Sequence, residues 1–582
     1  MSVFYKIYRL SARTVLGYAK PEDDDRYSFR LSKTATRKCI LPNSEAQEDN
    51  ALFYQIMCVL HGGRFPEIEK QSILPDLCET IFIMDFAGIF DRRQGKHQSD
   101  RQKKAESLFR PEGITLDFGS GESKYLAFER SGSMSRQARL TFIRSDLYEE
   151  VRRRIMLNMT VGRCQLSKLY AYNGLMLSSG TRIDGLALAK PHRVVVVKNP
   201  SFRKAARVIT VEGVSESEGV KKYRRVEENG TREIESKRFD GEGLISKELA
   251  AQIDKLYCGK HIHHSFQVRM PYVKGMLHEV DYKDLMISAG GKTVTDIWGE
   301  KHPIEETEII LTESMFKGLG WLKENGMDWA DYWNAFERYD HALYITGVSK
   351  PRPERFTELN FQFLTTLSMT AEEFRPADLP LGWDHSPAED TREWITKATE
   401  QRYYDLCCDE DYRLHVFDED RVAAAVLKKN PLFLYEPKFT KQLSAMAERT
   451  LKDYGVGHLL VEGDVRYLSG DLLELIALAM DRPEHLTQKQ FPYFNALMAQ
   501  KFQSEHFYAP KALYEDHGAC IVLRNPHIAR NEEIRLKTYK TKANRDNMRN
   551  YYLGHLSDVL MIDIQMLAAE RLGGADYDTA TW

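Results

Sequence analysis

The spacing of hydrophobic and polar residues divides the chain into β-rich and helical stretches. From about Gly162 onward, short apolar runs such as RVVVVKNP, ARVITVEG, SFQVRMPYV and IEETEIILTE are separated by Gly and Asp. Short strands at this spacing are typical of a compact barrel or sandwich rather than a βαβ fold. Helical patterns follow from Phe316 to about Phe374, and β-type sequence returns at GACIVLRNPHIARNEEIRLKTYK. The pattern predicts two β-rich regions joined by a helical middle.

Three further stretches add detail to this pattern. The first 150 residues mix strand-like runs, IFIMDFAGIF and ITLDFGS, with charged helical segments, and contain no motif that we can interpret. The highly charged stretch from Ser215 to Lys237 predicts a solvated hairpin tip or insertion. The run SGDLLELIALAM predicts a helix with Ser469 as its N-cap.

Length and composition indicate a protein with several cores. At 582 residues the chain exceeds the size of a single core, and no apolar run approaches the roughly 20 residues that span a bilayer. The N-terminus lacks the apolar stretch of a signal peptide. The 8 cysteines are scattered without a C-x-x-C pair, which fits a reducing compartment. We therefore expect a cytoplasmic protein without a membrane partner.

Local clusters of ionisable residues are more informative about possible binding partners than the net charge of −3. Cys258 with His261, His263 and His264 could hold a metal ion, but we favour a polar turn before a strand. Basic residues gather in two places, and for each we favour a solvated face. These clusters are Arg152, Arg153 and Arg154, and Lys537, Lys540, Lys542 and Arg545.

The sharpest chemical feature is the segment RLGGADYDTATW. In an extended segment, residues two apart face the same way, so Asp576 and Asp578 could point at one cation. Two adjacent carboxylates repel each other, which favours a bound divalent ion, and oxygen ligands select Mg²⁺ or Mn²⁺. Taken alone, however, Asp-x-Asp is more often a polar surface turn.

The surrounding segments strengthen the metal hypothesis. CIVLRNPHIARNEEIRL lies about fifty residues upstream, with LSDVLMIDI between. This order resembles the second catalytic barrel of the two-barrel RNA polymerases, above all the eukaryotic RNA-dependent RNA polymerase family and its bacterial and phage relatives. In that family a strand ending in Arg-x-Pro precedes a Gly-rich turn into D-x-D-G-D. The matching residues are Arg524, Asn525, Pro526, Gly573, Gly574, Asp576 and Asp578.

A second resemblance to the same family lies in the first β region. Three segments match in family order: FDGEGLISKELAAQI, FQVRMPYVKGMLHEVD and ILTESMFKGL. The matching residues are Asp240, Gly241, Gly243, Ser246, Arg269, Lys274, Gly275, Ser314, Met315 and Lys317. In the family, two lysines of the first barrel face the metal aspartates of the second, and here the matching lysines are Lys274 and Lys317.

The resemblance implies an α+β fold and a nucleotidyltransferase activity. We expect an N-terminal mixed domain of unknown role at 1–155, a first double-psi β-barrel region at 156–325, a helical connector at 326–460 and a second double-psi barrel region at 461–582. The implied function is template-dependent RNA synthesis on RNA or DNA from nucleoside triphosphates. Asp576 and Asp578 would hold Mg²⁺ or Mn²⁺ and, with Lys274 and Lys317, form the catalytic set. Arg524, Arg269, Gly573 and Gly574 would contact the substrate.

The last motif departs from the family. Thr579 and Ala580 stand where the family has Gly and then a third Asp, so we expect weak Mg²⁺ binding and slow synthesis or none, unless Asp558 or Asp563 completes the site. We favour truncation or a frame change over the loss of a metal site. A non-catalytic nucleic-acid-binding scaffold and a metal-dependent nuclease using His555 or His527 remain alternatives.

Overall fold

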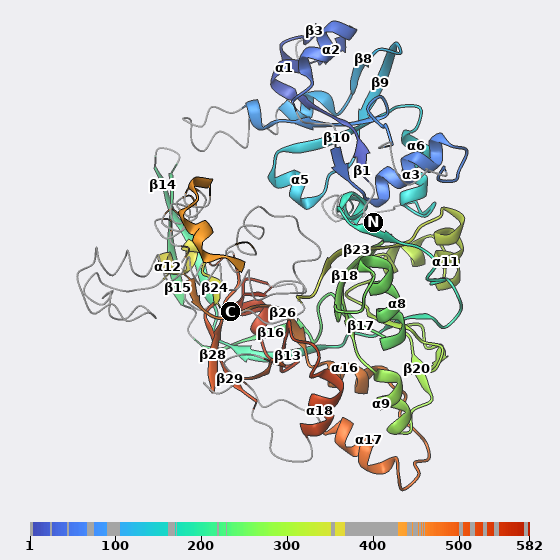
Figure 1. The fold of residues 1–582 in the computed structure, drawn as a ribbon, viewed down its shortest axis with the longest axis vertical. Helices are drawn as coiled ribbons and strands as arrows, with labels where there is room; N and C mark the ends of the chain where they lie inside the picture. The colour runs from blue at the N-terminus through green and yellow to red at the C-terminus, as the bar shows by residue number, and fades with distance from the viewer. Residues whose placement is uncertain are drawn as a thin grey trace, which may run out of the picture.

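A computed structural model gives the fold (Figure 1). It describes residues 4–23, 26–42, 46–66, 75–89, 105–160, 172–217, 220–227, 230–350, 356–366, 430–438, 460–499, 505–511, 518–525, 532–539, 546–574 and 580–581, with a few single residues between them. In Figure 1 the N-terminal unit lies at the top, above the first β region, and the second β region lies lower and to the left.

The N-terminal unit is built on a 6-stranded mixed sheet. In sheet order its strands are β2 (Tyr8–Ser11), β7 (Ile81–Asp85), β10 (Arg139–Arg144), β9 (Glu122–Ala127), β8 (Ile114–Asp117) and β5 (Arg30–Leu31). Its helices are α1 (Ala12–Leu16), α2 (Lys33–Cys39), α3 (Ala51–Leu60), α5 (Gly132–Arg136) and α6 (Tyr148–Ile155). Two small pairs are β1 (Phe4–Lys6) with β6 (Ala46–Glu48), and β3 (Lys20–Asp23) with β4 (Arg26–Ser28). The predicted strands IFIMDFAGIF and ITLDFGS are confirmed as β7 and β8.

The first β region forms a 7-stranded sheet. In sheet order its strands are β11 (Thr181–Ile183), β23 (Leu343–Val348), β18 (Ser265–Met270), β19 (Val273–Glu279), β17 (Glu242–Ile245), β22 (Ile309–Thr312) and β12 (Val194–Val197). Strand β12 is the run of four valines, all buried on both faces, as near-continuous apolar strands usually are. Strand β23 belongs to this sheet although it lies in the segment predicted to be a helical connector.

Helices and small hairpins surround this sheet. The helices are α8 (Lys247–Cys258), α9 (Tyr282–Ser288), α10 (Leu319–Glu324) and α11 (Trp329–Arg338). The small pairs are β13 (Ser201–Ala206) with β16 (Arg232–Lys237), β14 (Ile209–Ser217) with β15 (Val220–Glu227), and β20 (Thr293–Thr295) with β21 (Lys301–Pro303). The predicted charged insertion is confirmed, because β14 and β15 form a hairpin of their own.

The second β region is a 6-stranded sheet. In sheet order its strands are β28 (Ala519–Val522), β29 (Ile534–Thr538), β27 (His506–Tyr508), β30 (Val559–Ile562), β26 (Val465–Gly470) and β31 (Ala580–Thr581). Its helices are α16 (Leu472–Ala479), α17 (Phe491–Met498), α18 (Asp546–Leu553) and α19 (Ala568–Arg571). Between the two β regions, α12 (Phe361–Thr366) follows β24 (Phe356–Glu358), which pairs with β25 (Leu460–Glu462).

The two sheets share a pattern of four strands. In the first, β18, β19, β17 and β22 are neighbours whose pairings are antiparallel, parallel and antiparallel. In the second, β27, β30, β26 and β31 repeat that order of pairings. Both β17 and β26 lead directly into a helix. The shared pattern supports two related units.

Two local predictions from the sequence were wrong. The N-cap of α16 is Asp471, whose side chain accepts from the Leu473 amide at 3.1 Å, while Ser469 is the penultimate residue of β26. Arg154 is not on a solvated face: it is 5% exposed and donates to the Gln55 side chain at 2.6 Å and to the Tyr339 carbonyl at 3.0 Å. Arg154 thus joins the N-terminal unit to the first β region.

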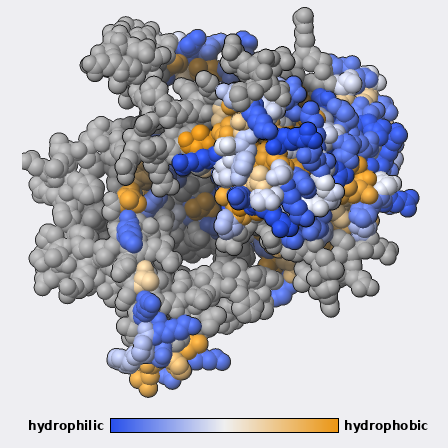
Figure 2. All heavy atoms as spheres, turned by 90° about the horizontal axis from the view of Figure 1, so that it is seen from above, coloured by the Kyte–Doolittle hydropathy of each residue, from blue (hydrophilic) through white to orange (hydrophobic). Residues whose placement is uncertain are grey.

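Polar residues predominate on the face shown in Figure 2, and the hydrophobic core extends across both β regions. Seen from above, the described atoms in Figure 2 are largely hydrophilic, with hydrophobic residues in smaller groups. Within the part of the chain that the structure describes, no helix has both the length and the apolar character needed to cross a membrane. One hydrophobic cluster combines Val195 and Leu244 of the first β region with Leu472 and Val559 of the second, so the two β regions share a core.

Candidate active site

Lys274 and Lys317 lie on backbone segments that run antiparallel beside each other. Lys274 is the second residue of β19, and Lys317 comes shortly after β22. The Lys274 amide donates to the Met315 carbonyl at 3.1 Å, and the Lys317 amide donates to the Tyr272 carbonyl at 2.7 Å. Both lysines are half-buried. The Lys317 ammonium donates to the Ser314 carbonyl. The fold therefore brings together the two lysines that the motifs single out.

The glycine motif packs against the same segments. The Gly241 carbonyl accepts from the Met276 amide at 2.8 Å, and the Gly241 amide donates to the Ser314 hydroxyl at 2.9 Å. A Cβ at Gly275 would lie 2.1 Å from the Gly241 carbonyl oxygen, which leaves room only for glycine. The three motif segments of the first β region thus meet in one place.

Aromatic side chains hold the turn between β18 and β19. Tyr272 has a φ of +60°, a left-handed conformation that is uncommon for a bulky residue. The Tyr332 hydroxyl donates to the Pro271 carbonyl at 2.8 Å, and the Tyr272 ring meets Trp321 with centroids 5.2 Å apart. Backbone strain of this kind persists only where the surroundings enforce it. Here they fix the start of the strand that carries Lys274.

Arg269 adds a third positive charge. It lies directly across from Lys274 in the β18–β19 register. Its guanidinium donates to the Val268 carbonyl at 2.8 Å, and the residue is buried. Because two cations lie on directly opposed residues, Arg269 and Lys274 together raise the positive electrostatic potential of this corner, although the two charges repel each other. We call Arg269, Lys274 and Lys317 the basic corner.

In the second β region, Arg524 holds the turn that leads into the Asp-Tyr-Asp motif. Its guanidinium donates to the Leu572 carbonyl at 3.2 Å. Gly573 and Gly574 follow with φ of +70° and +73°, values that suit glycine. This contact is structural and does not test the predicted role of Arg524 toward substrate.

The metal aspartates lie outside the described residues. Asp576 and Asp578 cannot therefore be placed against the basic corner, and their expected approach to within about 10 Å of a lysine remains a prediction. Beyond them, Ala580 of β31 pairs with Arg466 of β26.

Glu242 is a buried carboxyl that motif reasoning missed. It stands between the two glycines of the first motif, is fully buried, and accepts from the Ser469 hydroxyl at 2.6 Å and from the Gly470 amide at 2.9 Å. Burial raises the pKa of Glu242 to about 8. Glu242 therefore links β17 to β26 as a largely neutral acid at neutral pH. The sequence feature that could have indicated this buried contact is an ionisable residue, Glu242, between two glycines.

Of the other candidate acids and histidines, Asp558 and His555 lie at the junction between the two β regions, while Asp563 and His527 make other contacts. Asp558 is 3% exposed, burial raises its pKa to about 7, and its carboxylate lies 3.5 Å from the Ser265 hydroxyl. Asp563 instead accepts from the Gln565 amide at 3.0 Å. A histidine of the nuclease alternative, His555, has its Nε2 2.9 Å from the Glu279 carbonyl. The other, His527, is buried, and its amide donates to the Gln362 side chain at 3.2 Å.

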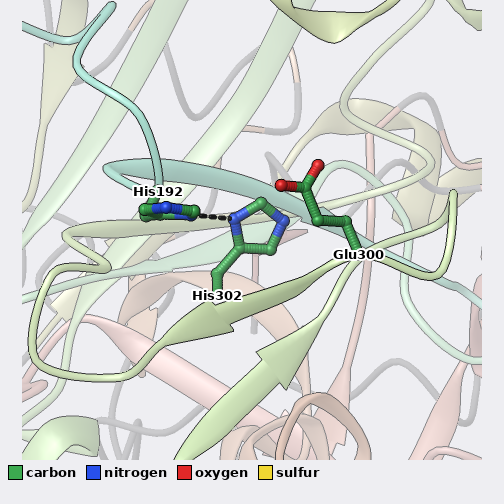
Figure 3. Close-up of side chains that lie close together, drawn as sticks. All are labelled: His192, Glu300 and His302. Atoms are coloured by element: carbon green, nitrogen blue, oxygen red, sulfur yellow. Dashed lines mark hydrogen bonds between the residues drawn. The ribbon is translucent and has the colours of Figure 1, made fainter.

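Three groups of histidines with acids or a cysteine stand out among the described residues as possible metal ligands. One of them, drawn in Figure 3, brings His192, Glu300 and His302 together. The two imidazoles of that group face each other with Nδ1 atoms 2.9 Å apart. His302 also contacts Asp296 through Nε2 at 3.1 Å. The His192–His302 pair therefore makes good hydrogen bonds without an ion.

Comparison with solved structures identifies the class of fold. The chain is similar to the RNA-dependent RNA polymerase QDE-1 from Thielavia terrestris, with a TM-score of 0.51 and 13% identity, over 100% of this chain and 53% of that one. At this identity the likeness shows the fold alone.

Comparison with curated proteins agrees. The chain is 25% identical over 287 residues to the DNA-directed RNA polymerase YonO of Bacillus phage SPbeta, a match that covers 47% of this chain and 29% of the relative. No family model matches the chain. The predicted resemblance is confirmed to this extent: the chain is similar in sequence to a phage RNA polymerase and similar in fold to an RNA-dependent RNA polymerase. It spans about half of the solved structure and less than a third of the phage relative.

Proposed function

We propose that the chain carries the two catalytic barrels of a template-dependent RNA polymerase. The observation that carries the proposal is the convergence of three motif segments on the basic corner, because it gathers cations where a polyphosphate could bind. We further propose that both β regions are double-psi barrels, and the strand pattern that they share supports this. The proposed units are the N-terminal mixed domain at 1–155, the barrels at 156–325 and 461–582, and the connector at 326–460.

The reaction would be attack of a 3′-hydroxyl on the α-phosphate of a nucleoside triphosphate, with pyrophosphate leaving. Positioning and charge stabilisation dominate such transfers. Lys274 and Lys317 would bind phosphate oxygens as point charges, while the planar guanidinium of Arg269 adds directed donors. The contacts of Tyr332 and Trp321 with the Pro271–Tyr272 turn would keep the two lysines in a fixed position relative to each other. Asp576 and Asp578 would hold Mg²⁺ or Mn²⁺, which supplies charge neutralisation and activates the attacking hydroxyl.

The test is strand extension by the full chain. The chain is incubated with labelled nucleoside triphosphates, Mg²⁺ or Mn²⁺, and either a DNA or an RNA template. Two template types are needed because the similar proteins are named for different templates. Longer products are expected, formed at a low rate because Thr579 and Ala580 stand where the family has Gly and a third Asp. K274A and K317A should each reduce the rate at least about tenfold, which corresponds to about 1.4 kcal/mol of transition-state stabilisation.

A matched control is K323A, because Lys323 is an exposed lysine at the end of α10 in the same β region. It should leave the rate unchanged. Shorter strands would favour a nuclease. Unchanged strands with retained binding would favour a scaffold if they persist when Gly replaces Thr579 and Asp replaces Ala580. Either result would overturn the polymerase proposal.

A further inference from the structure

A second cluster of histidines lies away from the basic corner, where the loop after α8 meets the end of β19. His261 and His264 come from the loop, and Glu279 is the last residue of β19. The Glu279 carboxylate oxygen Oε2 lies 3.2 Å from His261 Nε2 and 2.9 Å from His264 Nδ1. One ligand atom from each residue falls within 4.8 Å of the others.

We propose that His261, His264 and Glu279 bind a divalent transition-metal ion of the zinc type. Two imidazoles and one carboxylate form a ligand set that suits Zn²⁺ and disfavours Mg²⁺, which prefers oxygen alone. In a tetrahedral zinc site, ligand atoms lie about 3.3 Å apart. The observed separations from Oε2 therefore need to change by only a few tenths of an ångström.

A second, independent observation supports a ligand here. The Nδ1 atom of His261 is buried and makes no hydrogen bond among the described residues, and the nearest carboxylate oxygen, on Asp254, is 3.6 Å away. Burying a polar atom without a hydrogen bond is unfavourable. Metal binding through Nε2 orients the ring and lets Nδ1–H turn to the Asp254 carboxylate, the usual outer partner of a metal-bound histidine.

Neighbouring residues distinguish this cluster from the adjacent one. Asp254, Cys258 and His263 are also close together, but the Asp254 carboxylate already accepts from the Ile262 amide at 2.6 Å, the His263 amide at 2.8 Å and His263 Nδ1 at 2.7 Å. Those contacts clamp the loop. They orient His261 and His264 toward Glu279. The contacts of Asp254 with Ile262 and His263 therefore support the proposed metal site.

The site lies next to the second β region. The ring of His555, which follows α18 of the second region, packs on His264 with centroids 4.9 Å apart. His555 Nε2 is already engaged by the Glu279 carbonyl. The fourth metal position therefore goes to a water molecule, and the metal fastens the loop to the end of β19, beside His555 of the second region. The proposal is independent of polymerase activity.

The test uses the full chain, stripped of metal by a chelator and then titrated with Zn²⁺ alone. We expect one Zn²⁺ per chain. H264N and E279Q should each weaken binding at least about a hundredfold, because losing a ligand costs more than the 10–100-fold typical of losing its outer partner. The controls C258S and H192N alter the other two groups and should bind Zn²⁺ as the unmodified chain does.

Co²⁺ replaces Zn²⁺ in a second measurement that needs no variant. The expected visible spectrum has the bands of a tetrahedral nitrogen and oxygen site without a near-ultraviolet thiolate band. No stoichiometric binding would overturn the proposal. So would a thiolate band, or binding that C258S or H192N abolishes while H264N keeps it.

Discussion

Replacing Glu242 by Gln tests whether a neutral carboxyl holds β17 against β26. Gln keeps an oxygen that accepts from the Gly470 amide and gains an amide that can donate to the Ser469 hydroxyl, but it cannot ionise. The variant therefore preserves the shape and hydrogen bonds of the contact and removes only the titration. Any difference that depends on pH then reports on Glu242.

The magnitude follows from the pKa of Glu242, which burial raises from 4.5 to about 8. A carboxyl whose pKa is higher in the folded state stabilises the fold when protonated, so its contribution is full below pH 4.5 and is lost as pH rises toward 8. Each pH unit in that window removes about 1.4 kcal/mol of unfolding free energy, or about 4–5 kcal/mol in all. At pH 5 the two proteins should differ by less than about 1 kcal/mol, whereas near pH 8 the Gln variant should be more stable by about 3–4 kcal/mol.

The assay is hydrogen exchange of the segment that contains the Gly470 amide, at pH 5, 6.5 and 8, corrected for intrinsic exchange. A local measurement is needed because a chain with several cores does not unfold in one step. E324Q is the control, since Glu324 is exposed at the end of α10. The reasoning is refuted if the protection of this segment depends on pH equally in E242Q and the unmodified chain.

Two further predictions concern packing and charge. In G275A, the new Cβ would lie 2.1 Å from the Gly241 carbonyl oxygen, so we expect a destabilisation of more than about 3 kcal/mol and loss of strand extension. The matched variant G320A, with no atom within 4 Å of its Cβ, should melt at or slightly above the normal temperature. R549M removes the buried partner of Asp471, whose oxygens lie 2.6 and 2.8 Å from the guanidinium. The variant should lose about 3–5 kcal/mol in denaturant unfolding, and a loss below about 1 kcal/mol would contradict this.

Strands and motif residues could be predicted because their signals are local. A run of four valines at β12 has few alternatives to a buried strand. Glycine is needed at Gly275 because the Gly241 carbonyl touches it, and at Gly241 because φ is +73°. The pairing of Lys274 with Lys317 was accessible only through family order, because nothing in the local sequence of either lysine indicates the other.

Contacts between distant segments could not be predicted, since they depend on where the sheets meet. The sequence predicted that Arg154 is one of three solvated arginines. It does not indicate that α6 packs against the first β region, where Arg154 binds the Tyr339 carbonyl. Ser469 is a good cap in isolation, but β26 extends through it, and Glu242 binds its hydroxyl. The sequence favoured a polar turn for the histidines near Cys258, and only the position of Glu279 beside two of them suggests that they could act as ligands.

The junction between the two β regions combines apolar attraction with buried polar contacts that select one orientation. Their shared hydrophobic cluster favours contact but is compatible with several relative positions. Glu242 meets Ser469 and the Gly470 amide only when β17 lies against β26 in this register. The Ser265 hydroxyl of β18 lies 3.5 Å from Asp558, the residue before β30. Misalignment would leave buried polar groups without partners, which costs more than the contacts gain. If the proposed polymerase function is correct, such selection would matter for the rate, because a misplacement of about 1 Å between catalytic groups can lower a rate about a hundredfold. The buried polar contacts would then contribute to function by fixing the geometry of the two β regions.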